Sequence, residues 1–133
     1  MYLLSGENIT CGYSSVDILS NCTIGVKRGQ IASIVGPNGA GKSTAMKAIF
    51  GLLGIRKGKI FLDGEDITNL QPQERVLKGM GFVPQTNNIF PSLSVQENLE
   101  MGAFIQAKNC ENMLNYIYEL FPILKDKRYQ QAG

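Results

Sequence analysis

The feature that most constrains the fold of this chain is one glycine-rich loop, Gly36-Pro37-Asn38-Gly39-Ala40-Gly41-Lys42-Ser43-Thr44. The loop matches the phosphate-binding pattern G-x-x-x-x-G-K-[ST] at every fixed position. An apolar run before it, Ile31 to Val35, predicts a buried strand. The residues after it, Lys42 to Leu53, predict a helix whose apolar side carries Ala45, Met46, Ile49 and Leu52. A strand, a glycine-rich turn and a helix in this order are the setting that a phosphate-binding loop needs.

Each part of this loop has a chemical task in holding a phosphate. Gly39 and Gly41 permit backbone conformations that a Cβ atom would forbid, so successive N–H groups can turn toward a phosphate. The start of the following helix adds unpaired N–H donors and the positive end of the helix dipole. Lys42 supplies a mobile positive charge for the β- and γ-phosphates, and the Ser43 hydroxyl can ligate Mg²⁺. The alternative, a chance match in a glycine-rich turn, does not explain the flanking strand and helix.

Composition excludes several other classes of protein. The chain is 44% hydrophobic and 18% charged, which is typical of a folded domain rather than a disordered one. A formal net charge of +2 is too small to indicate a nucleic-acid partner. Because the chain has no histidine, it cannot form Ser-His-Asp or Cys-His catalytic groups. With no C-x-x-C pair, no signal-peptide pattern and no apolar run of membrane-spanning length, we expect free thiols and a cytoplasmic location.

The remaining pattern predicts strands first and helices last. Further strands are predicted at residues 2–10, 22–26, 59–62 and 81–84, and a short helix begins near Pro72. Ser94 and Glu97 form a predicted capping box for a helix running toward residue 108, and a second amphipathic helix ends at Pro122. Alternating strands and helices after residue 30 predict an α/β fold, with antiparallel strands attached ahead of it. We therefore expect a core at residues 1–85 and the start of a helical lobe at residues 86–133.

Several short motifs, together with the glycine-rich loop, resemble those of ABC-transporter ATP-binding subunits. They are Gly51-Leu52-Leu53, the run from Gly58 to Gly64, Val83-Pro84-Gln85, Ile89-Phe90-Pro91, Glu97-Asn98-Leu99 and Met101-Gly102-Ala103. The resemblance covers essentially the whole chain and is closest to the branched-chain amino-acid importer type, with urea and lipopolysaccharide systems as related alternatives. It implies a P-loop NTPase core of the ABC type, with ATP and Mg²⁺ as its ligands.

The resemblance also implies roles for residues outside the loop. Tyr13 resembles the aromatic residue that stacks on adenine, a task that suits a flat π face, and Val16 is expected beside the base. Gln85 resembles the Q-loop glutamine, whose amide oxygen reaches Mg²⁺ or the attacking water. Residues 86–107 would then contact membrane-spanning permease subunits, and two ATP-binding subunits would pair around ATP at the inner face of the membrane. The plainer alternatives are an ordinary strand-end tyrosine and a solvated loop glutamine.

Four parts on which the family's ATP hydrolysis depends do not occur within these 133 residues. They are the signature loop, the Walker B segment, the D-loop aspartate and the switch histidine. The run Ile60-Phe61-Leu62-Asp63 begins like a Walker B strand, but Gly64 stands where glutamate is needed. We therefore expect an N-terminal half that binds ATP, hydrolyses it poorly alone, and is marginally stable or self-associates because strand edges and apolar surface are exposed. The alternatives left open are a truncated, non-catalytic nucleotide-binding module and an ABC ATPase without a transporter.

Overall fold

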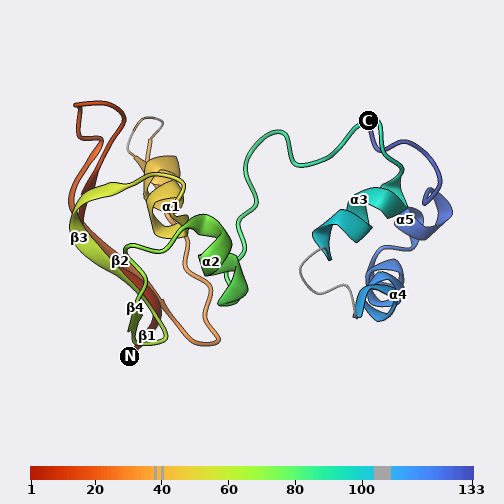
Figure 1. The fold of residues 1–133 in the computed structure, drawn as a ribbon, viewed down its shortest axis with the longest axis horizontal. Helices are drawn as coiled ribbons and strands as arrows, with labels where there is room; N and C mark the ends of the chain where they lie inside the picture. The colour runs from red at the N-terminus through yellow and green to blue at the C-terminus, as the bar shows by residue number, and fades with distance from the viewer. Residues whose placement is uncertain (38, 40, 104–108) are drawn as a thin grey trace. The chain divides into compact units, whose positions relative to one another are not determined.

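The chain folds as two units in the computed structural model, which describes residues 1–37, 39, 41–103 and 109–133. The first unit, Met1–Phe82, contains β1 (Tyr2–Cys11), β2 (Leu19–Lys27), α1 (Lys42–Phe50), β3 (Ile55–Leu62), β4 (Glu65–Asp66) and α2 (Pro72–Leu77). The second unit, Val83–Gly133, contains α3 (Val95–Gly102), α4 (Cys110–Leu120) and α5 (Pro122–Asp126). All strands of the described residues therefore lie in the first unit (Figure 1).

A four-stranded sheet in the order β2-β1-β3-β4 forms the frame of the first unit. Every pairing in it is antiparallel, and β1 pairs along most of its length with β2 on one side and β3 on the other. The predicted strands at residues 2–10 and 22–26 are confirmed, and burial alternates along most of β2 as expected of a half-covered strand. The α/β fold class with antiparallel N-terminal strands is confirmed as well.

One face of this sheet packs against α1 and forms the core of the first unit (Figure 1). The core contains Ile9, Cys11, Ala48, Ile49, Ile60 and Ile67, each at most 9% exposed. The helix α1 is shorter than predicted, because Gly51 takes a left-handed φ of 92° and ends it after Phe50. Ala45 is buried as predicted, but Met46 and Leu52 are 47% and 54% exposed.

A buried arginine joins the two helices of the first unit. Arg75, on α2, is only 2% exposed. Its guanidinium donates to the backbone carbonyls of Leu70 at 3.0 Å, Thr68 at 3.0 Å and Ile49 at 2.6 Å. Burial lowers the pKa of Arg75 below its usual range, but a guanidinium stays charged at neutral pH. Because the Ile49 carbonyl lies in the last turn of α1, these bonds attach the end of α1 to the start of α2.

Two strands predicted from the sequence, at residues 31–35 and 81–84, are wrong, because neither segment is a strand in the structure. Ile31 and Val35 are instead 98% and 88% exposed. An extended segment becomes a strand only when a neighbour satisfies its backbone N–H and C=O groups. Within the described residues neither segment pairs with any of the strands β1 to β4.

These extended segments leave apolar surface in the first unit, as the sequence predicted. An apolar cavity of about 390 Å³ lies along them and is lined by Ile31, Ile34, Met46, Phe50 and Phe82, among others. The rings of Phe50 and Phe82 stack at a centroid distance of 5.3 Å. The expected low stability or self-association stays a prediction.

The second unit is helical, and its first helix begins at the predicted residue, with the Ser94 half of the predicted capping box formed and no bond from the Glu97 carboxylate back to Ser94 among the described contacts. The backbone N–H of Glu97 donates to the Ser94 hydroxyl at 3.1 Å, which caps α3. Pro122 does more than end α4, since it is the first residue of α5. Residues 104–108, to which the predicted first helix extends, lie outside the described residues. No helix among the residues that the structure describes is long and apolar enough to cross a membrane.

Candidate functional site

Two glycines of the glycine-rich loop adopt the left-handed backbone conformation that glycine permits. Gly39 and Gly41 have φ values of 85° and 90°, in the left-handed region that favours glycine. A Cβ atom on Gly41 would also lie 2.6 Å from the end of the Leu19 side chain, so the loop closely approaches the start of β2. Asn38 and Ala40, two predicted members of the site, lie outside the described residues.

The loop leads directly into α1, whose first residue is Lys42. The Lys42 ammonium donates to the Gly36 carbonyl, so its charge lies against the backbone of the loop. Gly41 provides no side-chain cap, which leaves N–H donors of the first turn available to an anion. Ser43 is exposed, whereas Thr44 is 5% exposed and presents only its backbone to a ligand.

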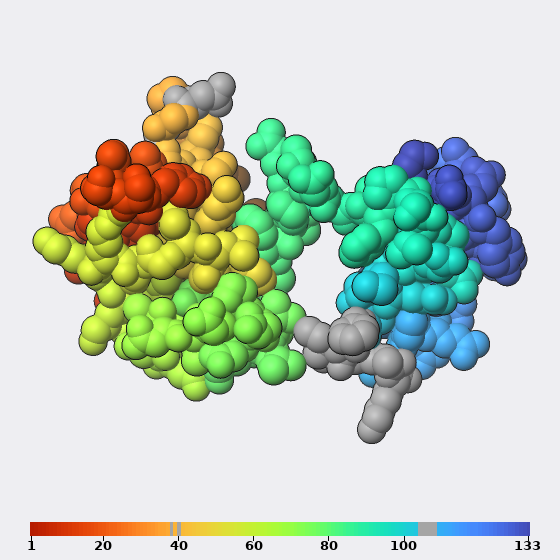
Figure 2. Space-filling view, turned by 45° about the horizontal axis from the view of Figure 1, so that its top comes forward, coloured from red at the N-terminus to blue at the C-terminus, as the bar shows by residue number. Residues whose placement is uncertain are grey.

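The loop between β1 and β2 brings the predicted base-binding residues to the same end of the first unit. Tyr13 and Val16 are 48% and 60% exposed, and the Val16 N–H donates to the Tyr13 carbonyl at 3.2 Å. Besides its contact with Leu19, a Cβ atom on Gly41 would lie 3.5 Å from the side chain of Ile18, so the two loops are neighbours. In the space-filling view the orange segment before α1 projects next to the red β1–β2 connection (Figure 2).

Two basic residues that the sequence analysis missed contact this β1–β2 loop. The Lys47 ammonium, on α1, lies 3.4 Å from the Tyr13 hydroxyl and 5.8 Å from the centre of its ring. Arg56, on β3, forms an ion pair with Asp17 and donates to the Ser14 carbonyl. No sequence motif marks either residue, because each contact joins elements that are far apart in the chain.

Gln85 belongs to the second unit, so its approach to the phosphate-binding loop stays a prediction. It is exposed and lies in a bend after Val83 and Pro84. The following segment is shaped by Asn98, which accepts from the Phe90 N–H at 2.7 Å and donates to the Phe90 carbonyl at 3.0 Å. The Glu-Asn-Leu motif had drawn attention to Asn98, but its task of fixing this bend is visible only in the structure.

The residues present fit a magnesium ion that arrives with a nucleotide better than a resident metal. No group of three or more His, Cys, Asp or Glu side chains suited to a metal occurs in the described part of the chain. Ser43 offers a single exposed hydroxyl at the start of α1. Mg²⁺ keeps several waters and is commonly held by one or two protein oxygens together with substrate phosphates, which matches this arrangement.

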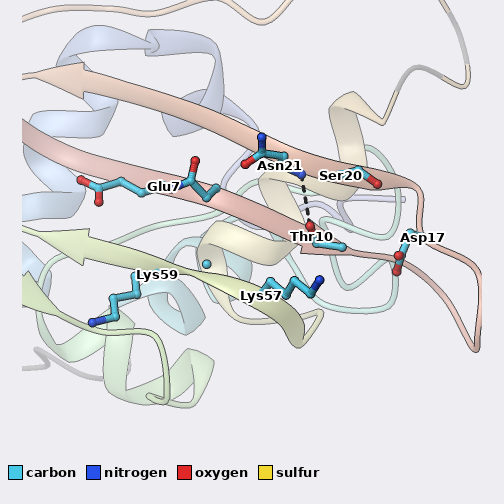
Figure 3. A pocket seen from close by; sticks show the side chains of 9 residues that line it. Glu7, Thr10, Asp17, Ser20, Asn21, Lys57 and Lys59 are labelled. Atoms are coloured by element: carbon cyan, nitrogen blue, oxygen red, sulfur yellow. Dashed lines mark hydrogen bonds between the residues drawn. The ribbon is translucent and has the colours of Figure 1, made fainter.

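A larger polar hollow, of about 640 Å³, lies on the open face of the sheet (Figure 3). Its wall includes Glu7, Thr10, Asp17, Ser20, Asn21, Lys57 and Lys59. The charges on this wall are balanced, since two carboxylates, Glu7 and Asp17, are matched by two lysines, Lys57 and Lys59. The Thr10 hydroxyl already accepts the Asn21 N–H at 3.1 Å. The hollow contains none of the predicted site residues, so we place the functional site at the glycine-rich loop.

Comparison with known proteins identifies a family for this chain. The family model described as ABC transporter matches residues 19–132. The chain is 36% identical over 132 residues to the probable branched-chain amino acid transport ATP-binding protein LivF of Archaeoglobus fulgidus, covering 98% of this chain and 56% of that protein. It is 40% identical over 99 residues to the lipopolysaccharide export system ATP-binding protein LptB of Haemophilus influenzae, covering 74% of this chain and 41% of that protein.

The fold leads to the same family. A crystal structure of a nucleotide-free ATP-binding cassette from an ABC transporter superposes with a TM-score of 0.84 at 29% identity. The match covers 100% of this chain and 58% of that cassette, so the chain spans little more than half the length of the proteins it resembles. Family model, relatives and fold agree, and the chain belongs to the ABC transporter family.

Proposed function

We propose that this chain is the nucleotide-binding part of the ATP-binding subunit of an ABC importer, and that it binds Mg-ATP through residues 36–44. The observation that carries the proposal is the loop geometry: left-handed Gly39 and Gly41 lead into an uncapped helix start with Lys42 beside the loop backbone. Backbone N–H groups, a helix dipole and an ammonium group then converge on one anion.

Different residues of the site bind different parts of the nucleotide. Lys42 takes the β- and γ-phosphates, and the Ser43 hydroxyl takes the magnesium ion. Tyr13 stacks on the base, with Val16 beside it; its exposed ring, on the β1–β2 loop whose Ile18 lies near Gly41, supports this role. Gln85 reaches the magnesium ion or the attacking water when nucleotide is bound.

The partner of the second unit is a membrane-spanning permease subunit. The segment from residue 86 to residue 103 exposes apolar side chains, with Ile89 49%, Phe90 51% and Met101 47% exposed. Apolar side chains gathered on an exposed surface favour a protein partner over free solvent. Residues 104–107 of the predicted partner segment lie outside the described residues. Through this contact the subunit is held at the membrane, and a second ATP-binding subunit completes the ATP sandwich.

The transported substrate is a branched-chain amino acid, as the name of the 36% identical relative indicates for that protein. The second candidate is a lipopolysaccharide-export type subunit, favoured by the 40% identity over 99 residues. Deleting the gene in the source organism separates the two candidates. Loss of leucine, isoleucine and valine uptake supports the importer, whereas normal uptake with a defective outer envelope supports the export type.

Nucleotide binding is tested by titrating the purified chain with a fluorescent ATP analogue in the presence and absence of Mg²⁺. We expect Lys42→Ala to weaken binding at least tenfold, because a charge-assisted contact to phosphate is worth about 1.5–3 kcal/mol. The control is Lys59→Ala, which removes another lysine of the first unit away from the loop. Equal affinities for wild type and Lys42→Ala would refute the proposal.

The same preparation tests catalysis. The 133 residues contain no Walker B or signature segment, so we propose that the chain alone releases phosphate well below the rate of about 1 per second typical of enzymes. A phosphate-release assay at saturating Mg-ATP measures this rate directly. A rate of that order, abolished by Lys42→Ala, would show that the chain is a complete ATPase and would overturn this part of the proposal.

A further inference from the structure

The β1–β2 loop, residues 12–18, is held in place from outside as well as from within. Its own backbone supplies two bonds, from Val16 N–H to the Tyr13 carbonyl at 3.2 Å and from Ile18 N–H to the Cys11 carbonyl at 2.9 Å. Gly12 is buried, and a Cβ atom there would lie 1.9 Å from the Val16 carbonyl oxygen, so the loop is tightly turned. The loop nevertheless presents Tyr13 and Val16 to solvent, where internal packing cannot fix their orientation.

The stronger external contact comes from Arg56 on β3. One guanidinium nitrogen pairs with the Asp17 carboxylate and the other donates to the Ser14 carbonyl. Ser14 has a φ of 52°, a left-handed conformation that is uncommon for a residue with a Cβ atom. The planar fork of an arginine can satisfy two acceptors at once, which a lysine cannot do. Arg56 therefore stabilises a loop conformation that the loop sequence alone disfavours.

A second external contact comes from Lys47 on α1. Its ammonium lies 3.4 Å from the Tyr13 hydroxyl and 5.8 Å from the ring centre, within the range of a weak cation–π attraction. Lys47 is five positions beyond Lys42 on the helix that follows the phosphate-binding loop. The helix that carries the phosphate-binding lysine therefore also contacts the Tyr13 ring and helps to fix its position.

We propose that Arg56 and Lys47 are positioning residues for recognition of the nucleotide base. Neither touches the nucleotide; they hold the β1–β2 loop so that Tyr13 and Val16 already stand where the base binds. Fixing the loop in advance lowers the entropy that binding would otherwise lose, so affinity rises without a new contact to the ligand. This inference rests on the proposed function, because it assigns the base to Tyr13.

The test compares two ligands that share a phosphate chain, ATP and inorganic tripolyphosphate, both with Mg²⁺. Tripolyphosphate has no base, so its affinity reports the phosphate-binding loop alone, and the ratio of the two affinities reports the base. We expect Arg56→Ala and Lys47→Met each to weaken ATP binding about three- to tenfold, and to leave tripolyphosphate binding within about twofold of wild type. Tyr13→Ala removes the proposed base contact itself, so its loss of ATP affinity is the largest that a positioning variant can reach.

Two further variants separate positioning from general stability. Asp17→Ala removes the loop side of the Arg56 ion pair, so it should change the ratio of ATP affinity to tripolyphosphate affinity as much as Arg56→Ala does. The double variant should change this ratio little more than either single variant. Arg56→Lys keeps the charge but reaches one acceptor, so it should restore part of the ratio. The matched control is Arg28→Ala, which breaks another exposed arginine–aspartate pair, Arg28–Asp63 at 3.2 Å, near the end of the sheet where β1 begins.

The outcomes are distinct. If Arg56→Ala weakens ATP and tripolyphosphate by the same factor, or weakens neither, the positioning role is wrong while phosphate binding stands. If Tyr13→Ala leaves the ratio of affinities unchanged, the base does not lie on Tyr13 and the inference is overturned. If Lys42→Ala binds both ligands as wild type does, the proposed function itself fails, and that result is seen with tripolyphosphate alone.

Discussion

Replacing Arg75 with methionine should destabilise the first unit more than any surface substitution. The guanidinium is 2% exposed and donates to backbone carbonyls of Leu70, Thr68, Ile49 and, at 3.4 Å, Ala48. Methionine fills much of the same space, so the cost of a cavity is small. It donates no hydrogen bond, so three closely bonded carbonyls lose their partner at about 1 kcal/mol each. We expect a loss of about 3 kcal/mol in the free energy of unfolding.

Urea unfolding followed by far-UV circular dichroism measures this loss. With a denaturant slope of about 2 kcal/mol per molar, 3 kcal/mol lowers the midpoint by about 1.5 M. The control is Lys78→Met at the C-cap of the same helix, where an exposed 2.7 Å ion pair with Glu65 is lost. Exposed pairs contribute about 0–1 kcal/mol, so the control midpoint should move little. A shift for Arg75→Met no larger than that of the control would refute the reasoning that the buried bonds stabilise this unit.

Three other predictions follow from single sites. Gly58→Ala should destabilise the sheet by about 1–3 kcal/mol in the same urea assay, because φ is 99° and the added Cβ atom would lie 2.5 Å from a carbonyl oxygen of β1. Burial raises the pKa of the Cys11 thiol, so at neutral pH it should react with a thiol reagent more slowly than the half-buried Cys22; equal labelling rates would contradict this. Hydrogen bonds from Thr68 hold the pKa of the Asp66 carboxyl below its usual 3.8, so this contribution to stability is present above pH 3.8 and is lost as the pH falls through the lower folded pKa. Thr68→Val should raise the Asp66 midpoint in an NMR titration, and an unchanged midpoint would count against the hydroxyl as a cause.

Some features of the chain that depend only on neighbouring residues were predicted correctly from the sequence. The pattern around Gly39 and Gly41 predicts left-handed turns before a helix, and both residues adopt them. Ser94 and Glu97 are three residues apart, and the predicted cap forms between the hydroxyl and the N–H. These predictions succeed because every atom they involve lies within one turn of chain.

Features that depend on a neighbour distant in the sequence were predicted wrongly or were not predicted. The apolar run from Ile31 to Val35 has the composition of a buried strand but stays extended and exposed, since a strand needs a partner for its backbone. The contacts of Lys47 with Tyr13 and of Arg56 with Asp17 span 34 and 39 residues of chain. The sequence does not predict these contacts, because a lysine or arginine that contacts a distant loop and one that is simply solvated give the same sequence pattern.

The sequence by itself predicted the phosphate-binding loop, because the loop is a continuous segment whose glycines, lysine and serine act through neighbouring backbone. It also determined the family, through motifs spread along the chain. Only the tertiary structure decided how the loop is supported: Arg75 joins α1 to α2, and Arg56 and Lys47 hold the β1–β2 loop beside the phosphate-binding loop. Such support comes from side chains that reach across the fold, and their partners are fixed by packing rather than by order along the chain.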